Sequence, residues 1–247
     1  MKYKSVVAVD NLSFAVEKGS ICGLIGTNGA GKSTVVNMIS GSSKPTSGEI
    51  IFKGARLDKL SPDRIAGLGV ARTFQNLRIF GKLSALDNVR IAAQARHSYN
   101  FAQMALGTPH YRSQERAITE SAQRILHRMG IGHYAEAEAG SLPYGHQRRL
   151  EIARCLALEP ELLLLDEPAA GMNPNESVSL ARDIRRVREE TGTTILLIEH
   201  DMSVVMSLCE YIYVMDFGIL IGEGDPDTIR RDPEVIRAYL GAEREYA

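Results

Sequence analysis

Residues 26–33 (GTNGAGKS) have the types and the spacing of a loop that holds phosphate groups. The apolar run Ile21–Ile25 precedes them, and a segment with helical spacing, Lys32–Ser40, follows. The glycines let successive backbone N–H groups curl around a phosphate, and the positive end of the helix dipole adds to the attraction. We therefore expect Lys32 to reach the β- and γ-phosphates of a nucleotide and the Ser33 hydroxyl to bind Mg²⁺. The predicted nucleotide contacts of this segment are Asn28, Gly29, Ala30, Gly31, Lys32, Ser33 and Thr34.

A second cluster of polar residues follows the strand-sized run Leu162–Leu165, which ends in Asp166 and Glu167. Ligands of open α/β sheets bind at the carboxyl ends of the strands. Asp166 is placed to hold Mg²⁺, directly or through water, and Glu167 to polarise the water that attacks the γ-phosphate. Acidic residues after strands are also common on surfaces, so this pair indicates a nucleotide site only in combination with the phosphate loop.

The elements around these residues alternate between short apolar runs and amphipathic segments, which predicts an α/β fold with a parallel sheet flanked by helices. The predicted strands are Ile21–Ile25, Glu49–Phe52, Leu162–Leu165, Thr194–Ile198 and Ile212–Met215. The predicted helices that accompany them are Lys32–Ser40, Ser177–Glu190 and Met202–Leu208.

The middle of the chain has a different pattern. Two segments there, Ala85–Arg96 and Gln114–Met129, favour helices, and the stretch between them, Ser98–Tyr111, is predicted to be a loop because it contains glycine and proline. We interpret this region as an α-helical subdomain inserted into the α/β core. A last helical turn is expected around Glu234–Leu240.

Composition limits the possible classes of protein. Hydrophobic residues make up 44% and charged residues 24%, as in folded globular proteins. The net charge of -1 gives no overall field that would attract nucleic acid, and we predict that none is bound. The basic pairs Arg148-Arg149 and Arg185-Arg186 are expected on solvated helix faces, and Cys22 in the core. Since no stretch has the roughly 20 apolar residues of a membrane-spanning helix, any membrane role is expected to be peripheral.

With these residues placed, nearly the whole chain resembles the ATP-binding cassette (ABC) ATPases. Gln75 stands at the glutamine loop of that family, and the resemblance implies that it contacts Mg²⁺ and the attacking water. Residues 170–174 (AGMNP) are similar to the D-loop, which faces a second subunit. His200 follows a predicted strand as the switch histidine of the family does, which implies contact with the γ-phosphate. Tyr3 lies where the family has an aromatic residue that stacks on adenine.

Residues 141–149 (SLPYGHQRR) stand in the place of the family signature, before a predicted helix, Leu150–Ala157. Pro143 lacks the hydroxyl and the N–H group that the usual serine offers to the ATP of a partner subunit. We therefore expect the contact with the partner's γ-phosphate to fall on the N–H groups of Gly145 and His146.

The resemblance implies a single ABC ATPase domain over residues 1–247. The expected P-loop NTPase (RecA-like) core comprises residues 1–75 and 141–225 and has an antiparallel β portion near the N-terminus. The helical subdomain is expected at residues 76–140 and a C-terminal tail at 226–247. Such a subunit hydrolyses ATP to ADP and phosphate, with Mg²⁺, at the cytoplasmic face of the inner membrane. The implied partners are a second ATPase subunit, identical or related, polytopic permease subunits and an extracytoplasmic solute-binding protein.

Three stretches, residues 71–80, 148–154 and 232–241, are similar to the ATPases of branched-chain amino-acid importers. This favours an importer of branched-chain or other amino acids. Residues 77–80 are expected to line a groove for a membrane subunit, or else to pack inside the helical subdomain. The alternatives are a lipid or lipopolysaccharide export ATPase, a soluble ABC ATPase of DNA repair or ribosomes, and a regulator that has lost hydrolysis. Intact Lys32, Asp166, Glu167 and His200 argue against the last.

Overall fold

The structure is a computed structural model that describes residues 1–3, 6–96 and 108–238. The chain divides into two compact units. The first consists of Met1–Arg72, Glu161–Ala170 and Arg188–Ala247, and the second of Thr73–Pro160 and Gly171–Val187. The boundaries of these units differ from the subdomain boundaries expected from the sequence. The expected boundaries remain a prediction.

The main sheet of the first unit has the strand order β10-β9-β3-β8-β7-β6. Its strands are β3 (Ile21–Gly26), β6 (Val70–Arg72), β7 (Leu162–Asp166), β8 (Thr194–Ile198), β9 (Tyr211–Asp216) and β10 (Ile219–Gly224). Neighbours from β9 to β6 run parallel, and β10 is antiparallel to β9. The predicted parallel sheet is confirmed. Sequence reasoning missed β6, which is too short to carry a pattern, and β10, whose apolar run is interrupted at Gly222 next to a register shift.

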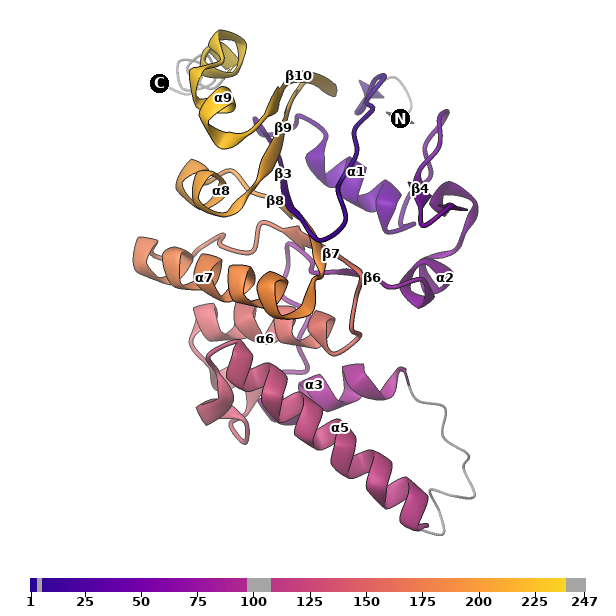
Figure 1. Ribbon diagram of the computed structural model, residues 1–247, viewed down its shortest axis with the longest axis vertical. Helices are drawn as coiled ribbons and strands as arrows, with labels where there is room; N and C mark the ends of the chain where they lie inside the picture. Colours follow the sequence, from indigo (N-terminus) through magenta and orange to yellow (C-terminus); the bar gives the residue numbers. More distant parts are fainter. Residues whose placement is uncertain (4–5, 97–107, 239–247) are drawn as a thin grey trace. The chain divides into compact units, whose positions relative to one another are not determined.

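Helices cover both faces of this sheet (Figure 1). In its described residues the helices of the first unit are α1 (Lys32–Ile39), α2 (Pro62–Gly67), α8 (Met202–Leu208), α9 (Pro226–Arg231), a short helix over residues 233–238 and the 3₁₀ turn Leu57–Lys59. Successive residues of a strand point to opposite faces. Leu24 of β3 accordingly lies in one core cluster with Val36 of α1. Gly23 faces the other way, where a Cβ would lie 3.5 Å from Val205 of α8. The strand that leads into the phosphate loop is therefore enclosed on both sides.

Two small antiparallel ladders are the other β structure among the described residues of the first unit. They are β1 (Lys2–Tyr3) with β2 (Val6–Val7), and β4 (Ile51–Phe52) with β5 (Ala55–Arg56). They confirm the expected antiparallel portion near the N-terminus, although β4 is shorter than the predicted strand Glu49–Phe52. Lys53 and Gly54, between β4 and β5, have φ angles of 52° and 79°. Positive φ at both loop residues is typical of the tight turn that fits the twist of a hairpin.

The second unit is helical in its described residues, as predicted. Its helices are α3 (Ala85–Gln94), α5 (Pro109–Arg128), α6 (Tyr144–Leu156), most of α7 (Pro174–Thr191) and the 3₁₀ turns Gly132–Tyr134 and Ala139–Ser141. The loop predicted at Ser98–Tyr111 is wrong at its end, because α5 begins at Pro109. Thr108 caps this helix by accepting a hydrogen bond from the Tyr111 N–H, and proline fits the first helical position. Residues 98–107 of that prediction lie outside the described residues.

Burial corrects one expectation about charge. Arg148 and Arg149, predicted to be solvated, are only 4% and 6% exposed. Arg185 and Arg186 are exposed and Cys22 is buried, as predicted. The tail is helical over residues 233–238, and the last two residues of the turn expected there lie outside the described part. Among the described helices, none combines the length and the apolar character that crossing a bilayer requires.

Candidate nucleotide site

The phosphate loop connects β3 to α1 through backbone conformations that need glycine. Gly26 and Gly31 have φ angles of 152° and 100°. A Cβ at Gly26 would lie 2.0 Å from the carbonyl oxygen of Met215, and one at Gly31 would lie 2.3 Å from that of Ala8. Gly29, with φ of 82°, meets no atom within 4 Å of such a Cβ, so its side of the loop is open. The loop is thus packed at both ends and accessible at its centre.

Lys32 is the first residue of α1 and is only 5% exposed. Its Nζ donates hydrogen bonds to the carbonyl oxygens of Gly26 (2.8 Å) and Thr27 (2.9 Å). Burial lowers the pKa of this ammonium group, while the carboxylates of Glu167 and Asp166 act in the opposite direction. The electrostatic coupling shows that the structure brings the phosphate loop and the acidic end of β7 together.

The other predicted residues of the loop differ in exposure. Asn28, Gly29 and Ser33 are exposed, Thr34 is half-buried, and Ala30 is buried. Thr27 is fixed by a hydrogen bond from its hydroxyl to Asp216 (2.8 Å). The first N–H groups of a helix have no partner within the helix, and the start of α1 therefore presents donors suited to an anion. The arrangement can hold phosphate oxygens with backbone donors and one buried cation.

Asp166 and Glu167 follow each other at the end of β7, and only Asp166 belongs to the strand. Asp166 is the last residue of the strand and 2% exposed. Glu167 has a left-handed backbone, with φ of 49°, and its N–H donates to the carbonyl of Ile198 at the end of β8 (2.9 Å). A left-handed conformation is uncommon for a residue other than glycine, and such strained conformations cluster at functional sites.

Glu199 is a residue that sequence reasoning missed. Its carboxylate is fully buried and accepts hydrogen bonds from the N–H of Ala169 (2.8 Å) and of His200 (3.2 Å). Burial raises the pKa of Glu199, and the backbone donors partly oppose that shift. The carboxylate therefore connects Ala169, two residues after Glu167, to His200, the residue predicted to contact the γ-phosphate. The His200 side chain itself is 57% exposed.

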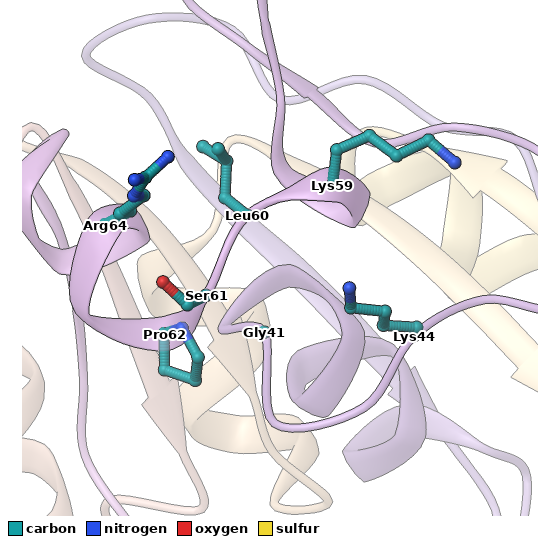
Figure 2. A pocket seen from close by; sticks show the side chains of 7 residues that line it. All are labelled: Gly41, Lys44, Lys59, Leu60, Ser61, Pro62 and Arg64. Atoms are coloured by element: carbon teal, nitrogen blue, oxygen red, sulfur yellow. The ribbon is translucent and has the colours of Figure 1, made fainter.

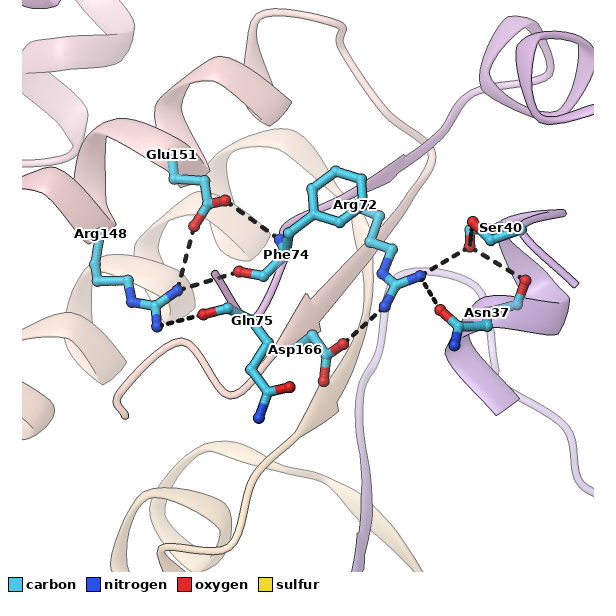
Figure 3. Close-up of polar contacts among 9 residues, drawn as sticks. Asn37, Ser40, Arg72, Phe74, Gln75, Arg148, Glu151 and Asp166 are labelled. Atoms are coloured by element: carbon cyan, nitrogen blue, oxygen red, sulfur yellow. Dashed lines mark hydrogen bonds and ion pairs between the residues drawn. The ribbon is translucent and has the colours of Figure 1, made fainter. Parts of the chain in front are cut away.

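Arg72, at the end of β6, was also missed. Its guanidinium forms an ion pair with Asp166 (2.9 Å) and donates to the side chains of Asn37 (2.6 Å) and Ser40 (3.1 Å). Figure 3 shows the guanidinium between the end of β7 and α1. The signal that could have identified both Arg72 and Glu199 is their position, because each is a charged residue at the carboxyl end of a parallel strand.

Three predicted residues belong to the second unit. Gln75 is exposed, in the segment that follows β6. Gly145 is the second residue of α6 and is buried, and a Cβ there would lie 3.3 Å from the Oε1 atom of Glu176. Pro143 precedes the helix, and its carbonyl accepts a hydrogen bond from the N–H of His146 (2.9 Å). One of the two N–H groups expected to face a partner's phosphate is therefore engaged within this turn.

The His146 side chain packs on aromatic rings. Its ring centroid lies 4.9 Å from that of Tyr134 and 6.3 Å from that of His133. Its Nδ1 atom is buried and has no hydrogen-bond partner among the described residues. Burial, followed by the charges of Arg149 and His133, lowers the pKa of this imidazole. The remaining predicted residue, Tyr3, lies in β1, and its contact with adenine stays a prediction.

Comparison with known families decides what this site belongs to. The family described as ABC transporter matches residues 9–170, more than half of the chain. This chain belongs to the ABC transporter family. A second family, described as branched-chain amino acid ATP-binding cassette transporter, matches residues 220–245. Membership confirms the expected class of enzyme, the ATPase subunit of a transporter.

Relatives agree with this assignment along nearly the whole chain. The high-affinity branched-chain amino acid transport ATP-binding protein LivG of Salmonella typhimurium is 43% identical over 98% of this chain and 94% of its own. BraF of Pseudomonas aeruginosa, described in the same words, is 42% identical with the same coverage. A probable branched-chain amino acid transport ATP-binding protein of Archaeoglobus fulgidus is 34% identical over 98% of this chain and 92% of its own.

Solved structures give the same fold. The ADP conformation of an ATP-binding cassette of an ABC transporter matches with a TM-score of 0.84 and 28% identity, covering 98% of this chain and 95% of that one. A nucleotide-free ATP-binding cassette from an ABC transporter matches with a TM-score of 0.81 and 26% identity, covering 97% and 95%. The predicted P-loop ATPase fold is confirmed.

A pocket of about 470 Å³ lies in the first unit, apart from the predicted residues (Figure 2). Its lining is Gly41, Lys44, Lys59, Leu60, Ser61, Pro62 and Arg64. None of the predicted nucleotide contacts is among them, and we assign the pocket no part in nucleotide binding.

Proposed function

We propose that this chain is the ATP-hydrolysing subunit of an importer of branched-chain amino acids. The observation that carries the proposal is the match of residues 220–245 to the family described as branched-chain amino acid ATP-binding cassette transporter. The similarity to LivG and BraF, with 42–43% identity over 98% of this chain, supports the same substrate class.

In this proposal the phosphate loop binds ATP. Backbone N–H groups of residues 28–34 surround the β-phosphate, and Lys32 turns from the loop carbonyls toward the β- and γ-phosphates. The hydrogen bonds of Lys32 to Gly26 and Thr27 support this role, because they hold the ammonium group inside the loop. Tyr3 is proposed to stack on the adenine.

Hydrolysis requires a group that accepts a proton from the attacking water. We assign this role to Glu167, whose backbone is held to Ile198 and whose following residues are held by Glu199. His200 is assigned to the γ-phosphate and Gln75 to the attacking water. The carboxylate of Glu199 contacts the N–H of His200 but is fully buried, so it serves to position the segment.

The residues present fit a magnesium ion. Ser33 offers a hydroxyl on the exposed side of α1, and Asp166 a carboxylate at the end of β7. These are the oxygen donors that Mg²⁺ prefers, and Gln75 is the third proposed ligand. When bound with ATP, the ion supplies positive charge against the phosphate oxygens.

The proposed partners follow from the subunit's class. A second ATPase subunit, identical or related, receives the N-terminal end of α6 at its ATP, with the contact proposed for the N–H of Gly145, because the N–H of His146 is bonded to the Pro143 carbonyl. Polytopic permease subunits and an extracytoplasmic solute-binding protein complete the transporter, with this chain at the cytoplasmic face of the inner membrane. Binding of nucleic acid is no part of the proposal.

Phe80 is proposed to contact the permease. The residue is 46% exposed, although its backbone N–H and C=O are fixed by the side chain of Asn88 (2.8 and 3.0 Å). The guanidinium of Arg154 lies 4.8 Å from the ring centroid. The proposal rests on this exposed ring and on its fixed backbone. Cysteine at position 80 should crosslink to a permease subunit, and consistent failure to do so would remove this part of the proposal.

Reconstitution tests the proposed substrate. The chain, its permease subunits and the solute-binding protein are placed in liposomes with ATP on the side of this subunit, and uptake of labelled leucine, isoleucine and valine is compared with that of glutamine. We expect ATP-dependent uptake of the branched-chain amino acids and none with Lys32→Ala. Uptake of glutamine alone, or of no amino acid while lipid moves instead, would contradict the proposed substrate.

A further inference from the structure

Two buried charged residues of α6 have no part in the proposed hydrolysis. Arg148 and Glu151 are both 4% exposed, and they lie one helical turn apart. Burying a charge is costly unless hydrogen bonds and an opposite charge compensate for it. The partners that compensate this pair therefore show what the pair holds in place.

Arg148 is directed at the backbone of the glutamine loop, by which we mean residues 74–78. Its Nη2 atom donates to the carbonyl oxygen of Gln75 (2.8 Å), and its Nη1 atom to that of Phe74 (3.2 Å). Its Nε atom donates to the Tyr144 hydroxyl (3.0 Å). The planar guanidinium can contact two successive carbonyls at once, which the single ammonium of a lysine does less well. Figure 3 shows the contacts of Arg148 with the loop.

Glu151 holds the same loop through the loop's backbone N–H groups. Its Oε1 atom accepts hydrogen bonds from the N–H groups of Phe74 (3.3 Å) and Arg78 (3.4 Å). Its Oε2 atom lies 3.4 Å from the Nη1 atom of Arg148. Burial raises the pKa of Glu151, and the loop N–H groups and Arg148 oppose that shift. The loop has no helix or strand of its own, so these side chains take the place of a backbone ladder.

We propose that Arg148 and Glu151 are positioning residues that fix the backbone of the glutamine loop to helix α6. The N-terminal end of this helix carries Gly145 and His146, the predicted contacts with a partner's ATP. The loop that carries Gln75 therefore moves together with the segment that reaches the second subunit. This inference rests on the proposed function for the meaning of Gln75 and Gly145, but the attachment itself is tested without ATP.

The same helix offers a matched control. Arg149 and Asp183 form a second buried pair, with Nε to Oδ2 at 3.0 Å and exposures of 6% and 7%. The Nη2 atom of Arg149 donates to Ser179 of α7 (2.9 Å). The partners of this pair thus join α6 to α7, whereas those of Arg148 and Glu151 lie in the glutamine loop. Glu151→Ala and Asp183→Ala therefore each remove a buried carboxylate from an arginine of α6, and only the first removes the acceptor of the Phe74 and Arg78 N–H groups.

Hydrogen exchange of the full chain, followed by mass spectrometry on peptides that cover residues 73–80, tests the attachment. With Glu151→Ala we expect the amides of Phe74 and Arg78 to exchange about tenfold faster, because each loses its acceptor. With Asp183→Ala we expect their exchange to stay within about twofold of the wild type. Unchanged exchange in Glu151→Ala, or an equal increase in both variants, would overturn the proposal.

A second pair of variants covers the case in which Glu151→Ala does not fold. Glu151→Gln keeps an acceptor without the charge, and Arg148→Lys keeps the charge without two parallel donors. Both should speed exchange over residues 74–78 by a smaller factor. Exchange at the wild-type rate in both would overturn the proposal equally.

Steady-state ATPase kinetics separate a positioning role from a general loss of stability. Neither Arg148 nor Glu151 is among the residues assigned to nucleotide, so Arg148→Lys should lower kcat while KM for ATP stays within about twofold. An increase in KM with kcat unchanged would contradict the role. If the wild-type chain itself hydrolysed no ATP, the proposed function would fail, while the exchange result would still decide whether the pair holds the loop.

Discussion

The guanidinium of Arg72 lies 2.9 Å from the carboxylate of Asp166, and the two residues end the neighbouring parallel strands β6 and β7. The same guanidinium donates hydrogen bonds to Asn37 of α1 and to Ser40 at the C-terminal end of that helix. Helix α1 is the helix that follows the phosphate loop. One cation therefore links the proposed magnesium carboxylate to the element that carries Lys32 and Ser33. The orientation of Asp166 depends on a residue that does not contact nucleotide in the proposed mechanism.

Replacing Arg72 with methionine should destabilise the protein strongly, because it removes the ion-pair partner of the buried Asp166 carboxylate. We expect a loss of about 3–5 kcal/mol in the free energy of unfolding, measured with urea. The control is Lys53→Met, which removes an ion pair with Glu161 whose side chains are about half exposed. That change should cost about 0–1 kcal/mol. Equal losses in the two variants would show that the Arg72 pair has no structural role.

Lys32→Ala should abolish the stabilisation of the protein by ATP. The ammonium group is the buried cation of the loop, and its removal leaves the loop itself with backbone donors alone. With ligand at about 100 times its dissociation constant, the wild type should gain about 2.7 kcal/mol. The measurement is the shift in melting temperature when ATP is added, and an equal shift in both proteins would contradict the assignment of this loop.

Lys32→Ala should also affect the protein in the absence of nucleotide. Because Lys32 is buried and donates to the carbonyls of Gly26 and Thr27, its removal takes a donor from two loop carbonyls, and the melting temperature of the nucleotide-free variant should fall modestly.

Gly145→Asp should remove ATPase activity in the dimer, because it places bulk and negative charge where a partner's γ-phosphate is expected. The structure adds a second effect, since a Cβ there lies 3.3 Å from the Glu176 carboxylate. Gly145→Ala adds only the Cβ and should retain most of the activity.

The double variant Gly145→Asp, Glu176→Gln separates the two effects. It relieves the repulsion between the carboxylates and should restore the melting temperature without restoring ATPase activity. If it also restored activity, the effect of Gly145→Asp would be a local clash and this segment would not be the contact with the partner's phosphate.

Acid should destabilise the aromatic cluster of His146, Tyr134 and His133. The folded-state pKa of His146 is lowered, so the folded protein binds fewer protons there than the unfolded chain, whose histidine pKa is about 6.5. The stabilising contribution is therefore complete above that pH and is lost as the pH falls below it. Burial is the main cause of the lowered pKa; Arg149 and then His133 add to it, and Glu176 opposes it.

The measurement for His146 is the free energy of unfolding at about pH 7.5 and about pH 5.5 for the wild type and His146→Gln. Glutamine does not titrate, so the wild type should lose more stability on acidification than the variant. The comparison cancels the contributions of Glu151 and Glu199, whose raised pKa values act in the opposite direction. Equal losses in both proteins would contradict the prediction.

What could be predicted from the sequence is local in the chain. The phosphate loop is contiguous, and β3, β7 and β8 are apolar runs of five or six residues, long enough to be identified. β6 has only three residues, and its place in the sheet depends on pairing with β7, about 90 residues later. Its last residue, Arg72, was missed for the same reason.

The burial of Arg148 shows a different limit. A basic pair at helical spacing usually faces solvent, and its sequence neighbours gave no reason to expect otherwise. Its partners are backbone carbonyls more than 70 positions earlier, in a loop that has no pattern of its own. Hydrogen bonds of this kind depend on how distant segments pack, and a single sequence does not contain that information.

The most direct test of the account is ATP hydrolysis by the assembled transporter with Glu167→Gln. The amide keeps the shape of the side chain but cannot accept a proton from the attacking water, so ATP binding should stay near the wild-type value while hydrolysis falls by about 10²-fold or more. The control is Glu161→Gln, which changes the acidic residue just before the first residue of β7. This variant should hydrolyse ATP at the normal rate. Hydrolysis by Glu167→Gln at the wild-type rate would contradict the assignment of the catalytic base and, with it, the proposed site.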